Sequence, residues 1–594
     1  MSLTSDRAVF LQSLQRNPLV LVRHLPCLGA ALFNKIANRF RSATQTFHRG
    51  AKRSPHWIKS SPHQRKLPVV QEHDIFLPNW NLQFDAVAVP ETKSAIYSVQ
   101  LEAGDMEAYF EANRWGFLCQ QLWDPSVSRH SALAAIRSWI AQNPNRDSEA
   151  WEPYSASERI ANLLVWLACN GLPDDEADAK NLDLKLFVGE SLKWIADHLE
   201  YYGENGTNNH ILNNARALVM GGVALGDEHS FQVGMKTLRF FLPRLLASAG
   251  FLRERSSHYQ LIVTNWVLDA WYFVHACLGE SDPDVIFLKD YAQRMTTATT
   301  LLCDERGELL GLIGDVSPDS PPAMSLRRLR WLYSSTLQGC RKPRVAGLEI
   351  ADDWFLLRYE GQSVLGNFPA GQFPPSFPTH GHGDHTGFVW RAGAVTILAD
   401  SGRYRYTADS VSTMQRSALG HSIPFVNGFA PLCESILQNG LWWPRPYATT
   451  RLFLAACESG VRMSHDGFAR ATPVNHHMRQ IVITSGGIEV GDTFKGQGSV
   501  ALKLRWNFGA EFDSFDAESC CVSGPDTQVR LHITGFDGAP TFRVCCQDQA
   551  GGWYSEAYAV KTASITLDVE GQVLLTASIK TRFEIIDVRN SRNT

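Results

Sequence analysis

A short run near the middle of the chain concentrates side chains that exchange protons or bind metals. It contains His380, His382, Asp384 and His385, and Asp400 and His421 follow it. Histidine is the usual zinc ligand and the side chain that gains or loses a proton most easily near neutral pH. Read as an extended strand, the run projects residues two apart to the same side, and its glycines let another segment approach the backbone. Such a density favours a functional site over an exposed polar turn.

Two kinds of site fit this run. The pattern His-x-His-x-Asp-His resembles that of the metallo-β-lactamase superfamily, which would make it a dinuclear metal centre. In the other interpretation one histidine transfers protons, and His382 helps to hold a single structural zinc with Asp400 and His421. Tetrahedral zinc accepts such a set with water or another donor in the fourth position. The run alone does not decide between the two.

A second polar segment, residues 205–214, opens a predicted helix with Asn209, His210 and Asn213. A helix N-terminus that carries amide side chains is suited to receive a carboxylate. A third segment places Tyr259 near Arg253 and Arg255. Their positive charge is expected to lower the pKa of the phenol from its usual value of about 10.

Composition describes a folded protein without a nucleic-acid signature. Of the 594 residues 44% are hydrophobic and 20% charged, and the net charge is −4. Residues 1–66 hold twelve Lys/Arg and one acidic residue, so the rest of the chain is acidic and no nucleic-acid partner is expected. No Cys-x-x-Cys motif, clean secretion signal or membrane-length apolar segment is present, which favours a cytoplasmic location over a periplasmic or secreted one.

The elements that must position these residues fall into two groups. Helical periodicity predicts helices over 105–123, 128–142, 155–170, 182–200, 208–224, 229–247, 258–278, 283–304 and 324–336. Short β-branched segments predict strands over 394–398, 480–484, 500–506, 529–533 and 564–569. We therefore expect a basic arm (1–66), a domain of helical hairpins (67–345) and an antiparallel β-sandwich (346–594), with a site where the two domains meet.

Several stretches in this order resemble the heparinase II/III-like polysaccharide lyases, a family that includes alginate and other uronate-polymer lyases. They are Phe110–Trp115, Trp151–Tyr154 with Glu158-Arg159, Asn208–His210 with Asn213, Glu254–Ser256 with Tyr259, His380–Asp384, Asp400–Gly402 and His421. The resemblance implies an α/α toroid followed by an antiparallel β-sandwich, with the active cleft between them. Gln260 departs from the pattern, since many relatives have histidine after the tyrosine.

The resemblance also implies roles. Asn209 and His210 would bind and neutralise a uronate carboxylate, Tyr259 and His380 would transfer protons, and His382, Asp400 and His421 would hold a structural zinc. Further contacts to an acidic polysaccharide would come from Asn113, Arg114, Trp151, Tyr154, Arg159, Asn213, Arg255 and Arg403. Exposure to solvent is the commoner explanation for Arg216, Arg255, Arg403 and Arg405.

These groups suit β-elimination at a 4-linked uronate. The reaction removes the proton at C5 and protonates the departing O4, and neutralising the carboxylate stabilises the charge that develops. The expected function is that of a polysaccharide lyase, with a bacterial capsular or exopolysaccharide as the expected substrate. The alternatives are a metal-dependent hydrolase of metallo-β-lactamase type and a non-catalytic protein that binds or assembles polysaccharide.

Overall fold

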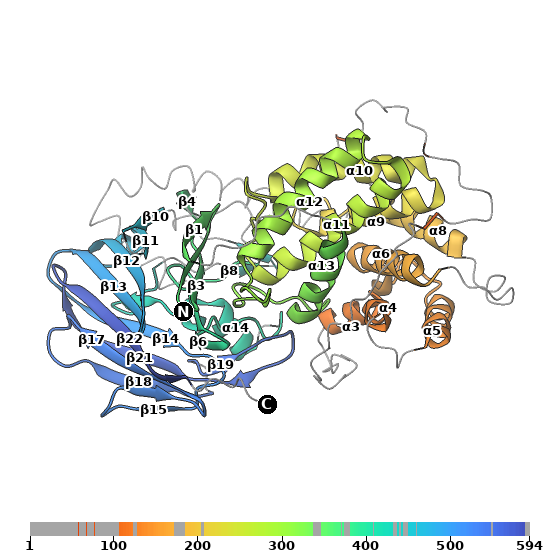
Figure 1. Ribbon diagram of the computed structural model, residues 1–594. Coiled ribbons are helices and arrows are strands. Elements are labelled where there is room, and N and C mark those ends of the chain that lie inside the picture. The colour runs from red at the N-terminus through yellow and green to blue at the C-terminus, as the bar shows by residue number, and fades with distance from the viewer. Residues whose placement is uncertain are drawn as a thin grey trace.

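The computed structural model describes most of the chain from Met106 onward (Figure 1). The described residues are 57–58, 67, 76–77, 106–122, 128–171, 184–203, 207–336, 346–369, 371–373, 380–407, 409–431, 436–438, 441–443, 450–458, 460–547 and 550–588. The expected basic arm (1–66) lies outside them, apart from Trp57 and Ile58.

Helices make up one half of the molecule. They are α3 (Met106–Ala112), α4 (Gly116–Gln121), α5 (Arg129–Gln142), α6 (Pro153–Asn170), α8 (Leu184–Asp197), α9 (His210–Leu225), α10 (Glu228–Leu245), α11 (Ser257–Leu278), α12 (Pro283–Leu301) and α13 (Pro322–Thr336). The predicted helices agree with these, except that 105–123 is two helices. Trp115 breaks the segment with φ 57°, and its buried ring packs on Trp139 and Phe187.

Two helices form the centre of the helical half. α9 packs on α6, α8, α10 and α11, and α11 packs on α12 and α13. Most of both helices is buried, because apolar residues surround them on nearly every side. By length and composition α11 is the single described helix able to cross a membrane, but 72% of its apolar window is buried inside the protein, as in a core helix.

Antiparallel sheets make up the other half (Figure 1). One sheet has the order β1 (Gly347–Ala351), β2 (Trp354–Tyr359), β3 (Gln362–Asn367), β5 (Val389–Ala392) and β6 (Val395–Leu398). The largest runs β15 (Ser514–Asp516), β16 (Cys521–Ser523), β17 (Thr527–Thr534), β22 (Ser578–Val588), β13 (Gly487–Gly496), β12 (Val474–Thr484), β11 (Gly460–His465), β10 (Thr450–Cys457) and β4 (Gly371–Phe373). A third runs β18 (Thr541–Cys545), β21 (Thr566–Leu574), β14 (Ser499–Asn507) and β7 (Pro424–Val426).

The three sheets share one hydrophobic core, to which Trp390, Phe583 and Trp506 contribute. The two-stranded pairs β8 (Ile436–Gln438) with β9 (Leu441–Trp443) and β19 (Trp553–Tyr554) with β20 (Thr562–Ala563) also lie in this half, as does the short helix α14 (Ser410–Arg416). Helices followed by antiparallel sheets confirm the predicted fold class.

A separate apolar cluster joins the two halves. Phe251 and Leu310 from the helical half pack there with Trp354 and Val389 from the sheets, and the rings of Phe251 and Trp354 stack at 5.3 Å. The segment 302–321, between α12 and α13, carries contacts to both halves. The domain division at residue 345 stays a prediction.

Candidate active site

Residues from both halves converge at the junction. Asn209, at the start of α9, donates from its backbone N and its Nδ2 to the Glu254 carboxylate at 2.8 and 3.0 Å. The same Nδ2 lies 3.2 Å from Nε2 of His380, which belongs to the sheet half. Glu254 is fully buried between them, with Oε2 3.3 Å from His380 Nε2. The predicted meeting of Asn209 with the histidine run is therefore present in the structure.

The Tyr259 ring covers one face of His380. Their rings stack at 3.6 Å with an interplanar angle of 9°, and the Tyr259 hydroxyl lies 2.7 Å from that of Tyr406. Burial raises the pKa of the Tyr259 phenol well above its usual value, and the Asp319 charge raises it further. The expected lowering by arginines is wrong, because Arg253 is exposed and Arg255 is directed to Asp384.

His210 contributes a positive charge to the site. Its Nδ1 lies 2.8 Å from Glu200 Oε1, and its ring packs 4.4 Å from that of Tyr154. Burial lowers the pKa of His210, but the Glu200 charge and hydrogen bond outweigh it and raise the pKa to about 9. His210 is therefore a cation at neutral pH, and about a third of its side chain remains exposed.

Asp315 connects the histidines, and sequence reasoning did not find it. Its carboxylate lies 3.1 Å from His380 Nδ1, 2.8 Å from His382 Nε2 and 3.1 Å from Arg416 Nη1. Burial favours its neutral form, but Arg416 and the two histidines outweigh burial and hold the pKa of Asp315 well below its usual value. A single aspartate in the loop after α12 has no motif, although the polar run Gly314–Pro322 between apolar segments was a signal.

Glu254 and Tyr406 are two further residues without a predicted role. Glu254 lay within a matched stretch, whereas Tyr406 follows Arg405 in an alternating Arg-Tyr sequence that reads as a solvated strand. Both have their polar atoms at the site, as the contacts to His380 and Tyr259 show.

Three predicted metal ligands lie together in the sheet half. Nitrogen and oxygen atoms of His382, Asp400 and His421 are all within 4.8 Å of one another, and all three residues are buried. His382 Nε2 bonds to Asp315, whereas its Nδ1 has no hydrogen-bond partner. Burial lowers the pKa of His382 to about 4 against the raising effect of Asp315, so the ring is neutral. A neutral imidazole with one nitrogen held by a carboxylate and the other available suits a zinc ligand.

The histidine run itself is a loop and not the expected strand. His380 and His382 do face the same carboxylate, but Asp384 points to Arg255, with an Nη1 to Oδ1 distance of 3.8 Å. A Cβ at Gly383 would lie 2.7 Å from the backbone N of Ala418, and one at Gly381 would meet the Arg255 guanidinium. Another segment therefore lies close to the backbone at both glycines, as the sequence predicted.

The eight predicted substrate-binding residues are buried side chains of the protein interior. Asn113, Arg114, Trp151, Tyr154, Arg159, Asn213, Arg255 and Arg403 are all 7% exposed or less. Arg159 illustrates this, since it donates to the Asn113 carbonyl and lies 3.9 Å above the Trp139 ring. The expectation that Arg216, Arg255, Arg403 and Arg405 are solvated is wrong, because all four are buried. Direct contact of these eight residues with substrate stays a prediction.

Two buried Arg–Asp pairs of the sandwich hold the loops that carry the histidines. Arg479 of β12 bonds Asp492 with two nitrogens and donates Nη1 to the carbonyls of Thr386 (3.0 Å) and Ser422 (2.8 Å). Arg505 of β14 bonds Asp568 and donates to the Leu419 carbonyl at 2.6 Å. The segments beside His385 and His421 are thus fixed from the sheets.

Comparison with known proteins agrees with this geometry. Residues 352–586 match the family described as heparinase II/III-like, C-terminal. The structure is similar to heparinase III (TM-score 0.60, 12% identity, covering 82% of this chain and 78% of that chain). It is also similar to a heparan sulfate lyase mutant from Pedobacter heparinus (TM-score 0.53, 13% identity, covering 96% of this chain and 92% of that one). No curated protein matches the sequence.

Helical hairpins joined to an antiparallel sandwich, with histidines at the junction, form the same fold as these two lyases. More specifically, the sheet half, over residues 352–586, matches the heparinase II/III-like C-terminal family. The predicted relationship to the heparinase II/III-like polysaccharide lyases is confirmed.

Proposed function

We propose that this protein is a polysaccharide lyase that cleaves an acidic, uronate-containing polysaccharide by β-elimination. The observation that carries the proposal is the contact of Asn209 and Tyr259 with His380. An amide, a phenol and an imidazole thus lie together, although Asn209 and His380 are 171 residues apart in the sequence. The heparinase and heparan sulfate lyase named above support the same class of reaction.

Carboxylate binding falls to Asn209 and His210. The cationic ring of His210, held by Glu200, neutralises the uronate, and the neighbouring amide adds a hydrogen bond. This interaction strengthens as charge moves from C5 onto the carboxylate, so it lowers the barrier more than it stabilises the ground state.

Proton transfer is divided between His380 and Tyr259. The ionised Asp315 accepts a hydrogen bond from His380 Nδ1, so His380 Nε2, which lies 3.2 Å from the Asn209 amide, acts as the base for the C5 proton once the substrate takes over that amide. The raised pKa of Tyr259 keeps its phenol protonated, so that it donates to the departing O4. When the product leaves, water carries the C5 proton from His380 back to the Tyr259 phenol, whose hydroxyl lies 2.7 Å from that of Tyr406.

The metal is a structural zinc in this proposal. The donor set of His382, Asp400 and His421, with the unpartnered Nδ1 of His382, fits one zinc ion. These three residues would hold the ion, and a bound zinc would supply structural stability to the segments that carry them and no part of the chemistry. Chelation should therefore lower the melting temperature, and metal analysis should find zinc in the untreated protein and less in His421→Ala.

A panel of acidic polysaccharides, including bacterial exopolysaccharides and capsules, tests the proposal. A lyase leaves unsaturated uronate ends that absorb in the short ultraviolet. Tyr259→Phe and His380→Ala should each lose about a hundredfold or more in kcat while the protein stays folded. Tyr272→Phe, on the same helix but remote from these contacts, is the matched control.

The alternatives predict other results. A dinuclear hydrolase would cut without forming unsaturated ends and would lose all activity on chelation. It is disfavoured because the four residues of the run face three different partners: the Asn209–Glu254 pair, Asp315 and Arg255. A non-catalytic binding protein would bind polymer without product, and Tyr259→Phe would not change that binding.

A further inference from the structure

Two carboxyl groups lie beside His210, and the mechanism above uses only one of them. An oxygen of Glu152, an oxygen of Glu200 and a ring nitrogen of His210 all lie within 4.8 Å of one another. Glu200 is buried, whereas Glu152, which precedes α6, is half-buried and can exchange protons with solvent. Glu152 forms no salt bridge within the described part of the chain. One imidazolium therefore has two neighbouring carboxyl groups, whose negative charges repel each other.

The two carboxyl groups differ in their hydrogen bonds. Glu200 Oε1 lies 2.8 Å from His210 Nδ1, and Glu200 Oε2 accepts from Asn214 Nδ2 at 3.0 Å. Glu152 accepts a single hydrogen bond, from the Ser155 N at 2.8 Å, which caps α6. Burial raises the pKa of Glu152, and the Glu200 charge raises it further. Since hydrogen bonds to a carboxylate favour its ionised form, Glu152 is the one of the two that accepts a proton more easily.

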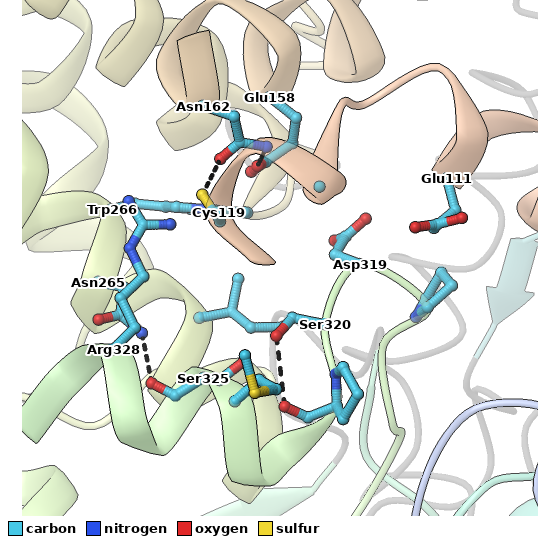
Figure 2. A pocket seen from close by; sticks show the side chains of 15 residues that line it. Glu111, Cys119, Glu158, Asn162, Asn265, Trp266, Asp319, Ser320, Ser325 and Arg328 are labelled. Carbon is cyan, nitrogen blue, oxygen red and sulfur yellow. Dashed lines mark hydrogen bonds between the residues drawn. The ribbon is translucent and has the colours of Figure 1, made fainter. Parts of the chain in front are cut away.

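Arg114 is a second positive charge near Glu152, but acidic groups surround it. Its charge opposes the rise in the pKa of Glu152. Arg114 also bonds Asp319 and lies 3.3 Å from Glu107. Asp319 and Glu111 line the same small cavity (Figure 2), and the Arg114 charge acts on Glu111 too. One guanidinium shared among these acidic groups leaves the charge of Glu152 poorly balanced.

A bound uronate adds one more negative charge to this group. The phenols of Tyr154 and Tyr202 also lie here, and burial raises the pKa of both, so neither changes the charge at neutral pH. With His210 as the receiving cation, the incoming carboxylate meets Glu152 and Glu200 at close range. Repulsion among carboxylates raises the affinity of the weakest-held one for a proton.

Given the carboxylate binding proposed for His210, on which this step rests, we infer that Glu152 takes up a proton from solvent when a uronate binds. The proton bonds to a carboxylate oxygen of Glu152, and the neutral carboxyl group no longer repels the incoming charge. Glu152 is then a positioning residue, which acts on the substrate through the charge balance around His210. Substrate binding is linked to pH well below the range in which His210 loses its own proton.

Calorimetry with glucuronate counts this proton. The monosaccharide has a free hydroxyl at C4 and no sugar to release, so the wild-type protein can be used without turnover. Titrations at about pH 6.5 in two buffers of different ionisation enthalpy give the number of protons taken up. His210 is already charged at that pH, because its pKa is about 9. We expect uptake of a measurable fraction of one proton with glucuronate and none with its uncharged methyl ester.

The same linkage predicts how affinity changes with pH. A proton taken up on binding makes binding stronger as the pH falls. Glucuronate affinity of the wild type should therefore decrease from about pH 6 to about pH 8, by at most about tenfold per pH unit for a single proton. The comparison of glucuronate with its ester needs no variant, so it tests the uptake even where a substitution disturbs folding.

Glu152→Gln assigns the proton to a residue. Glutamine keeps an oxygen for the Ser155 N and takes up no proton. The variant should still bind glucuronate, with no proton uptake and with an affinity that is flat over the same pH range. Glu149→Gln, an exposed glutamate three residues earlier, is the matched control and should keep the wild-type uptake. Unchanged melting temperatures show that the variants are folded.

Three results would overturn the inference. They are uptake that persists in Glu152→Gln, equal uptake with the methyl ester, and no binding of glucuronate. A requirement for added calcium ions would overturn it too, because a metal cation would then balance Glu152 and Glu200. The lyase is judged separately, by unsaturated product from polysaccharide. Uptake without such product upholds the linkage and overturns the lyase, and product without uptake does the reverse.

Discussion

Asp315 holds the two histidines in different chemical roles. One carboxylate oxygen bonds His380 Nδ1 and the other bonds His382 Nε2, so each ring is left with a single nitrogen for function. That nitrogen is Nε2 in His380 and Nδ1 in His382. A single side chain thus orients the proposed base and the proposed zinc ligand.

Asp315→Asn should lower kcat about a hundredfold or more, with KM little changed, because the amide no longer fixes the tautomer of His380. It should also cost about 3–5 kcal/mol of unfolding free energy, since Arg416 loses its buried partner. Steady-state kinetics and urea denaturation measure the two effects. Asp269→Asn, another buried and paired carboxylate, should cost similar stability and keep kcat. Equal kcat losses in both variants would contradict the positioning role.

His210 gives the site a pH dependence at the alkaline side. Its pKa rises from 6.5 to about 9 in the folded protein, so its stabilising contribution is complete below pH 6.5 and is lost as pH rises through 9. We expect kcat/KM to fall over the same range as the cation that binds the carboxylate disappears. Glu200→Gln should move this fall toward pH 6.5. A profile that does not respond to Glu200→Gln would exclude His210 as the group.

The site could be predicted only where motifs mark it. Asn209, Tyr259 and His380 stand in matched stretches, and their order along the chain indicated one site. Asp315 and Tyr406 have ordinary neighbours in sequence, and only folding places them beside the histidines. The burial of the arginines could not be predicted either, because their partners, such as Asp269 for Arg216, lie far away in the sequence.

At the scale of elements, helices were predictable because apolar residues recur with a helical period. The one error, residues 105–123, comes from Trp115, whose left-handed backbone no periodicity reveals. The run 380–385 fails as a strand for a different reason. Its backbone bonds to no strand: the Asp315 N donates to the His380 carbonyl, and the Gly383 N donates to the carbonyl of Arg416, the last residue of a short helix.

The sheet element that fixes these loops is open to a direct test. Arg479→Lys keeps a charge for Asp492 but cannot also reach the carbonyls of Thr386 and Ser422, because an ammonium lacks the fork of a guanidinium. We expect kcat to fall about tenfold and the melting temperature to drop, as the histidine loops move. Arg462→Lys, exposed on β11, is the control for kinetics and calorimetry. Unchanged kcat would show that the histidine loops keep their positions without the hydrogen bonds from Arg479.

At the scale of the molecule, the two halves approach each other closely at Gly314. Its φ of 78° disfavours any side chain, and a Cβ there would lie 2.5 Å from the Arg255 carbonyl and 2.7 Å from the His380 carbonyl. The backbone of the helical half therefore lies directly against the segment that carries the proposed base.

Gly314→Ala should cost well over 1 kcal/mol and most of the activity, because it combines backbone strain with displacement of His380. Gly279→Ala is a matched control with the same φ of 78° and nothing within 4 Å of the added Cβ. It should cost only about 1 kcal/mol and leave turnover intact. Denaturation curves and product absorbance compare them. Equal behaviour of the two variants would mean that contact between the halves does not govern the site.

The position of Asp315 determines where chimaeras with related enzymes can be joined. Although it precedes α13, its carboxylate belongs with His380, His382 and Arg416. A graft that replaces everything before residue 346 would bring in a foreign loop beneath native histidines. A crossover just before Gly311 instead keeps the aspartate together with the rings that it orients, so the orientation of His380 and His382 should survive there and be lost at a crossover before residue 346.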